Sequence, residues 1–409
     1  MKAMNISLNN VLVFLLLGIL HITFYYHGNI VYVSNLGELL ALLLFLDGIF
    51  LKKWSIDKDY IVIFFLCILP VMIVSFIQIF YVRDFIVVKT LIHRCLFIIA
   101  AFVIVKKISF DCFTSYLRYW GGINVIVIAI VFAFGSIEIL DSSIHTYGAV
   151  GMSYMGLSFP FQISVFDEMI FRCGGLFGHP NNFGLLSAIG FIGVINSNYS
   201  YKQKLFWLMV FVISFLINES RGSVLIVGLY FLSYQLFKRK LTVKNMLINA
   251  GSCMLIASIF FSLAYLRDDT GTDYATGRAG LLAGISQKFD TESELVQLFG
   301  VGFGNVGKYV VSKFAADIPL DDSYLYTLVE LGYIGELFFL ISLIIVIYYS
   351  YKRTSMEWNV WFSFLVAFGA HSLFESDFVG GKYMYLITFL FYMIADKSSY
   401  KDKTKHNAI

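Results

Sequence analysis

Three arginines stand in short polar motifs that interrupt an apolar chain, and their setting suits the binding of a phosphate-bearing group. Arg172 lies in "FRCGGLFGHPNNFG", Arg221 in "NESRG" and Arg278 in "TGRAGLLAGI". A guanidinium offers several N–H donors in a rigid fork that matches phosphate oxygens. Residues 267–322 hold more acidic than basic side chains, so we expect individually placed arginines there and no diffuse basic patch.

Simpler interpretations of two of these arginines stay open. Arg221 stands at the end of an apolar stretch, where an arginine can extend its side chain to the membrane surface. Arg278 could form a surface ion pair with Asp273 or Asp269. Residue type alone does not separate these structural roles from anion binding.

Acidic and histidine side chains are candidates for orienting a hydroxyl or accepting its proton. Asp321 and Asp322 begin the motif "DDSYLYTLVELGYIG". The alternative is that Asp322 or Ser323 caps the helix that follows. Weaker candidates for the same role are Glu168, His179 and the pair His371 and Glu375. The histidines and cysteines show no spacing typical of a metal site, so we expect no metal and no cofactor.

The composition places these motifs in a membrane protein. The 409 residues are 59% hydrophobic and 14% charged, with a mean hydropathy of +0.78. The net charge of +3 is spread over the chain, which argues against a nucleic-acid partner. We expect an all-α polytopic fold with about twelve transmembrane helices, each near the length needed to cross a bilayer. The expected spans are 8–26, 31–50, 60–80, 85–105, 119–139, 181–197, 204–218, 222–237, 244–266, 323–350, 357–375 and 381–395.

Lysine and arginine residues set the orientation, because most of them fall on one side if the spans alternate. Both termini are then cytoplasmic, and two long loops lie outside, each with a short amphipathic helix. These helices are expected over "SVFDEMIFR" and "TGRAGLLAGISQKF", the latter with Leu281, Leu282, Ile285 and Phe289 on one face. The expected segments are 1–139, 140–180, 181–266, 267–322 and 323–409.

Local signals predict two turns near the candidate residues. Gly174 and Gly175 are expected to fold the chain tightly before Pro180, with Asn181 or Asn182 capping the next helix. The glycines of "LFGVGFGNVGKY" are expected to let the backbone turn closely over a ligand or a helix end. That stretch lacks the features of a nucleotide-binding loop.

Taken in order, the motifs resemble a known family over roughly residues 165–350. "FRCGGLFGHPNNFG" is similar to the arginine-glycine-His-Pro-Asn element of the O-antigen ligase and Wzy-type polysaccharide polymerase superfamily. "NESRGSVL" is similar to its Ser-Arg hairpin, "ATGRAGLLAGI" to its Gly-Arg helix start and "LFGVGFGNV" to its glycine turn. "DDSYLYTLVELGYIG" is similar to its His-Asn-Ser-Tyr-Leu element with the downstream Glu-Leu-Gly.

The resemblance implies a metal-independent glycosyl transfer at the outer face of the bacterial inner membrane. An oligosaccharide would move from an undecaprenyl-pyrophosphate carrier to a hydroxyl group. Arg221 and Arg278 would hold the pyrophosphate, with Arg172 as a third contact. We expect His179, Asn181 and Tyr324 to contribute to substrate binding. The implied partners are lipid-linked repeat units as donor and acceptor, membrane lipids and a chain-length regulator protein.

One departure from the family pattern favours a polymerase. Where ligases carry the histidine of the His-Asn-Ser-Tyr-Leu element this chain has Asp321, and Asp322 replaces the asparagine. A ligase that transfers polysaccharide to lipid A-core is the first alternative. The second is a flippase for lipid-linked oligosaccharides, suggested only by Lys89, His93 and Arg94 within an expected span. A membrane scaffold is a third reading.

Overall fold

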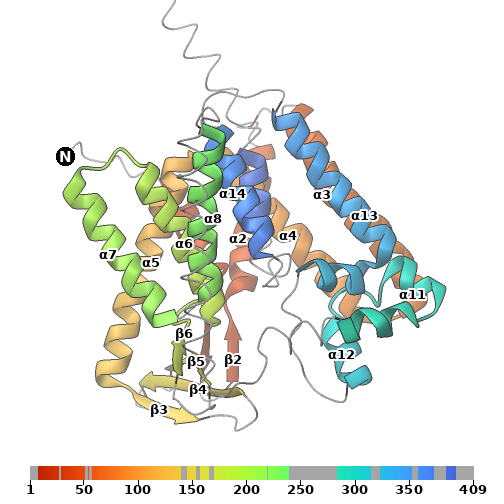
Figure 1. Cartoon of the computed structure of the whole chain (residues 1–409), viewed down its shortest axis with the longest axis horizontal. Helices are drawn as coiled ribbons and strands as arrows, with labels where there is room; N and C mark the ends of the chain where they lie inside the picture. Colours follow the sequence, from red (N-terminus) through yellow and green to blue (C-terminus); the bar gives the residue numbers. More distant parts are fainter. Residues whose placement is uncertain are drawn as a thin grey trace, which may run out of the picture. The chain divides into compact units, whose positions relative to one another are not determined.

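The computed structural model describes twelve stretches of the chain. The chain forms two compact units, one from residues 1–53 and 103–230 and the other from residues 54–102 and 231–409. Most of the described residues are helical (Figure 1). The described stretches are 8–26, 29–50, 54, 58–139, 145–152, 157–164, 170–218, 220–238, 283–314, 323–351, 358–372 and 384–392.

The first unit is built on three helices that pack side by side, α5, α6 and α7 (Figure 1). Small residues bring these helices close together, as is common between membrane helices. The buried ring of Phe211 on α7 lies directly against Gly121 of α5 and Gly190 of α6. The helices of this unit are α1 (Leu8–Ile19), α2 (Ser34–Phe50), α5 (Phe110–Phe134), α6 (Pro180–Asn196), α7 (Tyr201–Asn218) and the first half of α8 (Arg221–Lys238).

An antiparallel sheet lies at the end of this unit where α5 ends and α6 begins (Figure 1). Its order is β2-β1-β5-β4-β3, and β6 also pairs with β5. In that pairing Gln162 stands opposite Arg172. The strands are β1 (Thr23–Tyr26), β2 (Asn29–Tyr32), β3 (Ser136–Ile139), β4 (His145–Met152), β5 (Leu157–Ser164) and β6 (Ile170–Cys173).

The sheet corrects the all-α expectation at several points. The expected span 119–139 ends early, because α5 stops at Phe134 and Ser136–Ile139 is strand β3, and the expected span 31–50 overlaps strand β2. The expected first span at 8–26 is a helix only to Ile19, after which the chain forms the β1–β2 hairpin. The amphipathic helix expected over "SVFDEMIFR" is wrong in its last part, because Ile170–Cys173 is strand β6, and residues 165–169 lie outside the described residues. Aromatic and β-branched residues crowd these strands and favour extended backbone. Hydropathy alone does not separate a short buried strand from a helix.

The second unit is helical over its described residues. Its helices are α3 (Lys58–Val82), most of α4 (Phe85–Lys107), α11 (Glu294–Phe299), α12 (Val306–Phe314), α13 (Ser323–Tyr351), α14 (Trp358–His371) and the helical stretches 283–290 and 384–392. Ile285 and Phe289, expected to share an apolar face, are fully buried in one cluster with Val306, Val310 and Val329. The other two residues of that expected face, 281 and 282, lie outside the described residues.

Three helices within the described residues are long and apolar enough to cross a membrane: Phe85–Lys107, Phe110–Phe134 and Ser323–Ser342. They overlap the spans expected at 85–105, 119–139 and 323–350, but α5 both begins and ends earlier than expected. The chain is thus a mostly helical protein with membrane-spanning character. The expected span at 244–266 lies outside the described residues.

Candidate functional site

A tight glycine turn leads from strand β6 into helix α6. Gly175 and Gly178 have φ angles of 56° and 68°, a region in which other residues are strained. The side-chain amide of Asn124 on α5 holds this turn, donating to the Gly174 carbonyl at 3.0 Å and accepting from the Leu176 N–H at 2.7 Å. A Cβ at Gly175 would lie 2.3 Å from the Asn124 oxygen, so the expected tight turn is confirmed.

The first turn of α6 corrects the expected helix cap. His179, and neither Asn181 nor Asn182, is the N-cap, and its Nδ1 accepts a hydrogen bond from the Asn181 N–H at 3.2 Å. Pro180 takes the first helical position, where its missing N–H is not needed. Because His179 caps the helix, the Asn181 side chain is not needed as a cap, and it contacts Arg172 instead. His179 thereby gains a structural role that its sequence position did not reveal.

Arg172 joins three separate segments of the first unit. Its Nη2 donates to the side-chain oxygen of Asn181 at 2.6 Å, and its Nε donates to the backbone carbonyl of Asn218 at 3.2 Å. Strand β6 thus connects the start of α6 to the end of α7. The side chain of Asn181 is buried and that of Arg172 is half-buried.

The connection between α7 and α8 is tight and polar, as the motif "NESRG" predicts. The Asn218 side-chain oxygen accepts from the Ser220 N–H at 2.8 Å, and Ser223 donates its hydroxyl to the Ser220 hydroxyl at 2.7 Å. Arg221 is the first residue of α8. Gly184 in the first turns of α6 lies against Ser220 and Ser223, which leaves no room for a side chain there.

These contacts form one cluster, which we call the arginine cluster: Arg172, Asn181, Asn218, Ser220 and the start of α8. Two helices, α6 and α8, begin in it, and a helix N-terminus carries a partial positive charge that favours anions. The Asn218 side chain is fully buried, and its amide nitrogen has no hydrogen-bond acceptor among the described residues. The cluster therefore combines a guanidinium, two helix starts and a buried N–H donor without an acceptor, which makes it a candidate anion site.

Cys173 beside the cluster is not a reactive group. Burial raises the pKa of its thiol to about 11, partly offset by a hydrogen bond from the Gly175 backbone. The thiol is therefore protonated at neutral pH and a poor nucleophile.

The other candidate residues do not join this cluster within the described structure. Arg278, Asp321 and Asp322 lie outside the described residues. Tyr324 belongs to the second unit, at the start of α13, where its hydroxyl donates to the Gly369 carbonyl at 3.0 Å. Among the residues that the structure describes, no three histidine, cysteine or acidic side chains could hold a metal ion.

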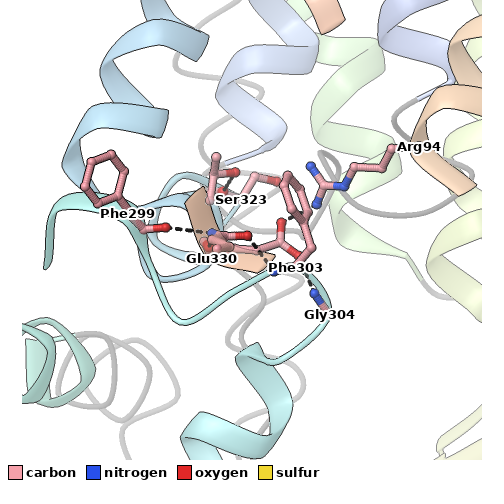
Figure 2. A network of polar contacts seen from close by, with 8 residues as sticks. Arg94, Phe299, Phe303, Gly304, Ser323 and Glu330 are labelled. Atoms are coloured by element: carbon pink, nitrogen blue, oxygen red, sulfur yellow. Dashed lines mark hydrogen bonds and ion pairs between the residues drawn. The ribbon is translucent and has the colours of Figure 1, made fainter. Parts of the chain in front are cut away.

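The second unit contains a buried ion pair that sequence reasoning missed. Arg94 on α4 pairs with Glu330 on α13 (Figure 2). Both side chains are almost fully buried. The Arg94 guanidinium also stacks on the Phe303 ring, 4.6 Å from its centroid. The second Glu330 oxygen accepts from the Gly304 N–H at 3.0 Å. No local pattern identifies a partner for Arg94, and the one sequence signal that points to it is the acidic residue in "VELGYIG".

The residues 300–304, here called the glycine turn, pack into a break in α13. Gly332 has φ 71° and ψ 179°, so the carbonyls of the turn before it lose helical partners. The Val301 N–H donates to the Val329 carbonyl at 2.8 Å, and Gln78 on α3 donates to the Glu330 carbonyl at 2.8 Å. Gly300, Gly302 and Gly304 all have positive φ. The expectation that these glycines turn the backbone over a helix end is confirmed.

Replacing Gly332 by alanine is expected to destabilise the protein clearly. Its Cβ would lie 2.4 Å from backbone atoms of Leu298 and Phe299, and left-handed backbone itself costs an L-residue about 1–2 kcal/mol. The matched control is Gly307→Ala in α12, where a Cβ meets nothing within 4 Å. This control should stabilise the helix by up to about 1 kcal/mol. Thermal melting in detergent measures both, and equal melting temperatures for the two variants would contradict the described break.

An exposed ion pair connects α12, which follows the glycine turn, to the link between α3 and α4. Lys308 of α12 donates to the Asp84 carboxylate at 2.8 Å, in the link between α3 and α4. The hydrogen bond from Lys308, with a second from the Ile86 N–H, lowers the pKa of Asp84 below its ordinary value. The pair therefore favours the folded state above the ordinary aspartate pKa and loses that effect as the pH falls through the folded-state value.

Comparison with known proteins adds no assignment. No protein-family model matches the chain, and no curated protein is significantly similar to it.

Proposed function

We propose that the chain polymerises undecaprenyl-pyrophosphate-linked oligosaccharide repeat units into O-antigen or capsular polysaccharide. The proposal rests on the order of the five motifs and on one structural observation. Arg172 binds Asn181 and Asn218, which brings two of those motifs and the starts of α6 and α8 into one cluster. A guanidinium beside two helix N-termini suits a pyrophosphate.

The proposed reaction is a glycosyl transfer. The bond between the anomeric carbon and the carrier phosphate breaks, and the acceptor hydroxyl oxygen forms the new glycosidic bond. Negative charge gathers on the departing lipid pyrophosphate, where Arg221, Arg278 and Arg172 would stabilise it. The proton of the acceptor hydroxyl would pass to Asp321 or Asp322. His179 supports this site by capping α6, and Tyr324 is proposed to bind substrate.

The proposed setting is the periplasmic face of the bacterial inner membrane. About twelve spans with cytoplasmic termini would place both segments, 140–180 and 267–322, outside. Three apolar helices of sufficient length support a membrane location. The proposed partners are lipid-linked repeat units, membrane lipids and a chain-length regulator.

Of the three residues that suggested the flippase alternative, Lys89, His93 and Arg94, one has a structural explanation. Arg94 is paired with Glu330 and packed on Phe303, so its charge supports the glycine turn and needs no transport role. The ligase alternative remains opposed by Asp321 and Asp322, which stand where that branch carries His and Asn.

Deleting the gene and resolving the cell's polysaccharide on a gel tests the proposal. We expect the ladder of repeat units to disappear while a single-unit band persists. Loss of every unit, with lipid-linked polymer accumulating, would instead indicate a ligase. A purified protein in vesicles provides the second check, since a polymerase lengthens a labelled lipid-linked repeat unit without moving it across the bilayer. Translocation without lengthening would contradict the proposal and indicate a flippase.

A further inference from the structure

Arg118 on α5 is a buried cation surrounded by aromatic rings. Its side chain lies within the first unit, and the residue is 5% exposed. The guanidinium carbon lies 4.6 Å from the centroid of Tyr119, 4.4 Å from that of Tyr199 and 4.7 Å from that of Trp207. We call these three rings the aromatic cage. They come from α5, from the link between α6 and α7, and from the second turn of α7.

The aromatic cage leaves the hydrogen-bonding capacity of Arg118 unused. Aromatic rings attract a cation through their faces and do not replace the acceptors that guanidinium N–H groups need. Among the described residues no hydrogen bond or ion pair involves Arg118, and its Nε is buried without an acceptor. The Tyr199 hydroxyl is already paired with Ser115 at 2.8 Å.

The charges around the aromatic cage are also unbalanced. Lys202 and Lys204 lie in the first turn of α7, and Lys204 uses its ammonium on the Ile195 carbonyl at 3.0 Å. The acidic residue on the same helix as Arg118 is Asp111, which is exposed and seven residues away, about 10 Å along the axis. Arg118 has no ion-pair partner among the described residues, and a buried charge is unfavourable without one.

We propose that Arg118 and the aromatic cage form a binding site for a phosphate group. The planar guanidinium binds two phosphate oxygens along its edge while the rings cover its faces. The phosphate can come from a lipid headgroup or from solution, and tyrosine and tryptophan rings are typical of the headgroup level of a membrane. The proposal is independent of the polymerase function.

Native mass spectrometry of the purified full-length protein in detergent tests the site. The probes are phosphatidylglycerol, diacylglycerol with the same acyl chains, and inorganic phosphate. We expect the wild-type protein to retain phosphatidylglycerol in preference to diacylglycerol, and Arg118→Met to bind it about tenfold more weakly. Arg118→Lys should be intermediate, because it keeps the charge and loses the fork. Arg83→Met, at an exposed arginine of the other unit, is the matched control.

Two outcomes of this experiment distinguish a lipid headgroup from free phosphate as the bound group. Arg118-dependent binding of phosphatidylglycerol that millimolar inorganic phosphate does not displace assigns the site to a lipid headgroup. Arg118-dependent binding of inorganic phosphate, with displacement of the lipid, assigns it to a free anion. Equal affinity of the wild-type and Arg118→Met proteins for both probes overturns the proposal.

A second measurement needs no change at position 118. Phosphatidylglycerol with a nitroxide at its headgroup should quench tryptophan emission of the wild-type protein, and Trp207→Phe should remove the most strongly quenched component. Diacylglycerol with a nitroxide at the equivalent position should quench less. Identical quenching curves for the wild-type protein and Trp207→Phe would argue against a phosphate bound beside the aromatic cage.

Discussion

Replacing Glu330 by glutamine is expected to lower the stability of the protein by on the order of 3–5 kcal/mol, because it leaves the buried Arg94 charge without its partner. Glutamine has nearly the same shape and can still accept the hydrogen bond from the Gly304 N–H. The change therefore removes the charge and keeps the contact with the glycine turn. Thermal melting in detergent and the fraction of monodisperse protein on a sizing column measure the effect.

Two further variants define what the Glu330 result means. Arg94→Met combined with Glu330→Met should recover much of the lost stability, because both charges leave the interior together. Asp84→Asn, which breaks the exposed pair with Lys308, should shift the melting temperature far less. If Glu330→Gln melts at the wild-type temperature, the buried ion pair is not a main support of the second unit.

Alanine at Arg221 or at Arg278 is expected to abolish polymer synthesis. Each guanidinium is proposed to stabilise the charge on the departing pyrophosphate, and loss of such a donor costs about 3 kcal/mol in the barrier, or roughly 10²–10³ in rate. The measurement is the polysaccharide ladder of cells that carry each variant, with protein amounts compared by immunoblot. Arg172→Ala should weaken the ladder and also lower the melting temperature, because Arg172 binds Asn181 and Asn218.

Lysine variants and a distant arginine provide the controls for this result. Arg221→Lys keeps the charge and loses the two-oxygen fork, so we expect partial activity. Arg83→Ala removes an exposed arginine of the second unit and should leave the ladder unchanged. A normal ladder from both the Arg221→Ala and Arg278→Ala proteins, at wild-type amounts, would disprove the assignment of the pyrophosphate site.

Local signals predicted much of the helical framework. The apolar stretches at 85–105, 119–139 and 323–350 appear as α4, α5 and α13, since helix length and hydropathy are properties of one segment. The glycine turn and the short connection at Asn218 follow from turn chemistry, which is equally local. The β1–β2 hairpin was not predicted, because a short apolar stretch fits a helix and a strand equally well until its pairing partner is known.

For the candidate site as well, the sequence identified some residues, but their contacts required the structure. The sequence drew attention to Arg172 and Asn181, but neither their hydrogen bond nor the cap formed by His179 follows from residue type. Asn218 and its unused amide nitrogen were missed as well, because a buried donor without an acceptor is recognised only when its neighbours are known.

The sequence by itself determined the mostly helical character, the helices long and apolar enough to cross a membrane, the arginine motifs and the glycine turns, because each depends on composition or on residues a few positions apart. Tertiary structure alone decided that Glu330 neutralises Arg94 and that Gln78 satisfies the Glu330 carbonyl. These partners lie 236 and 252 residues apart along the chain. The physical reason is that a buried charge or carbonyl is costly without a partner, and the partner can lie anywhere along the chain. Sequence spacing therefore does not predict which two groups pair.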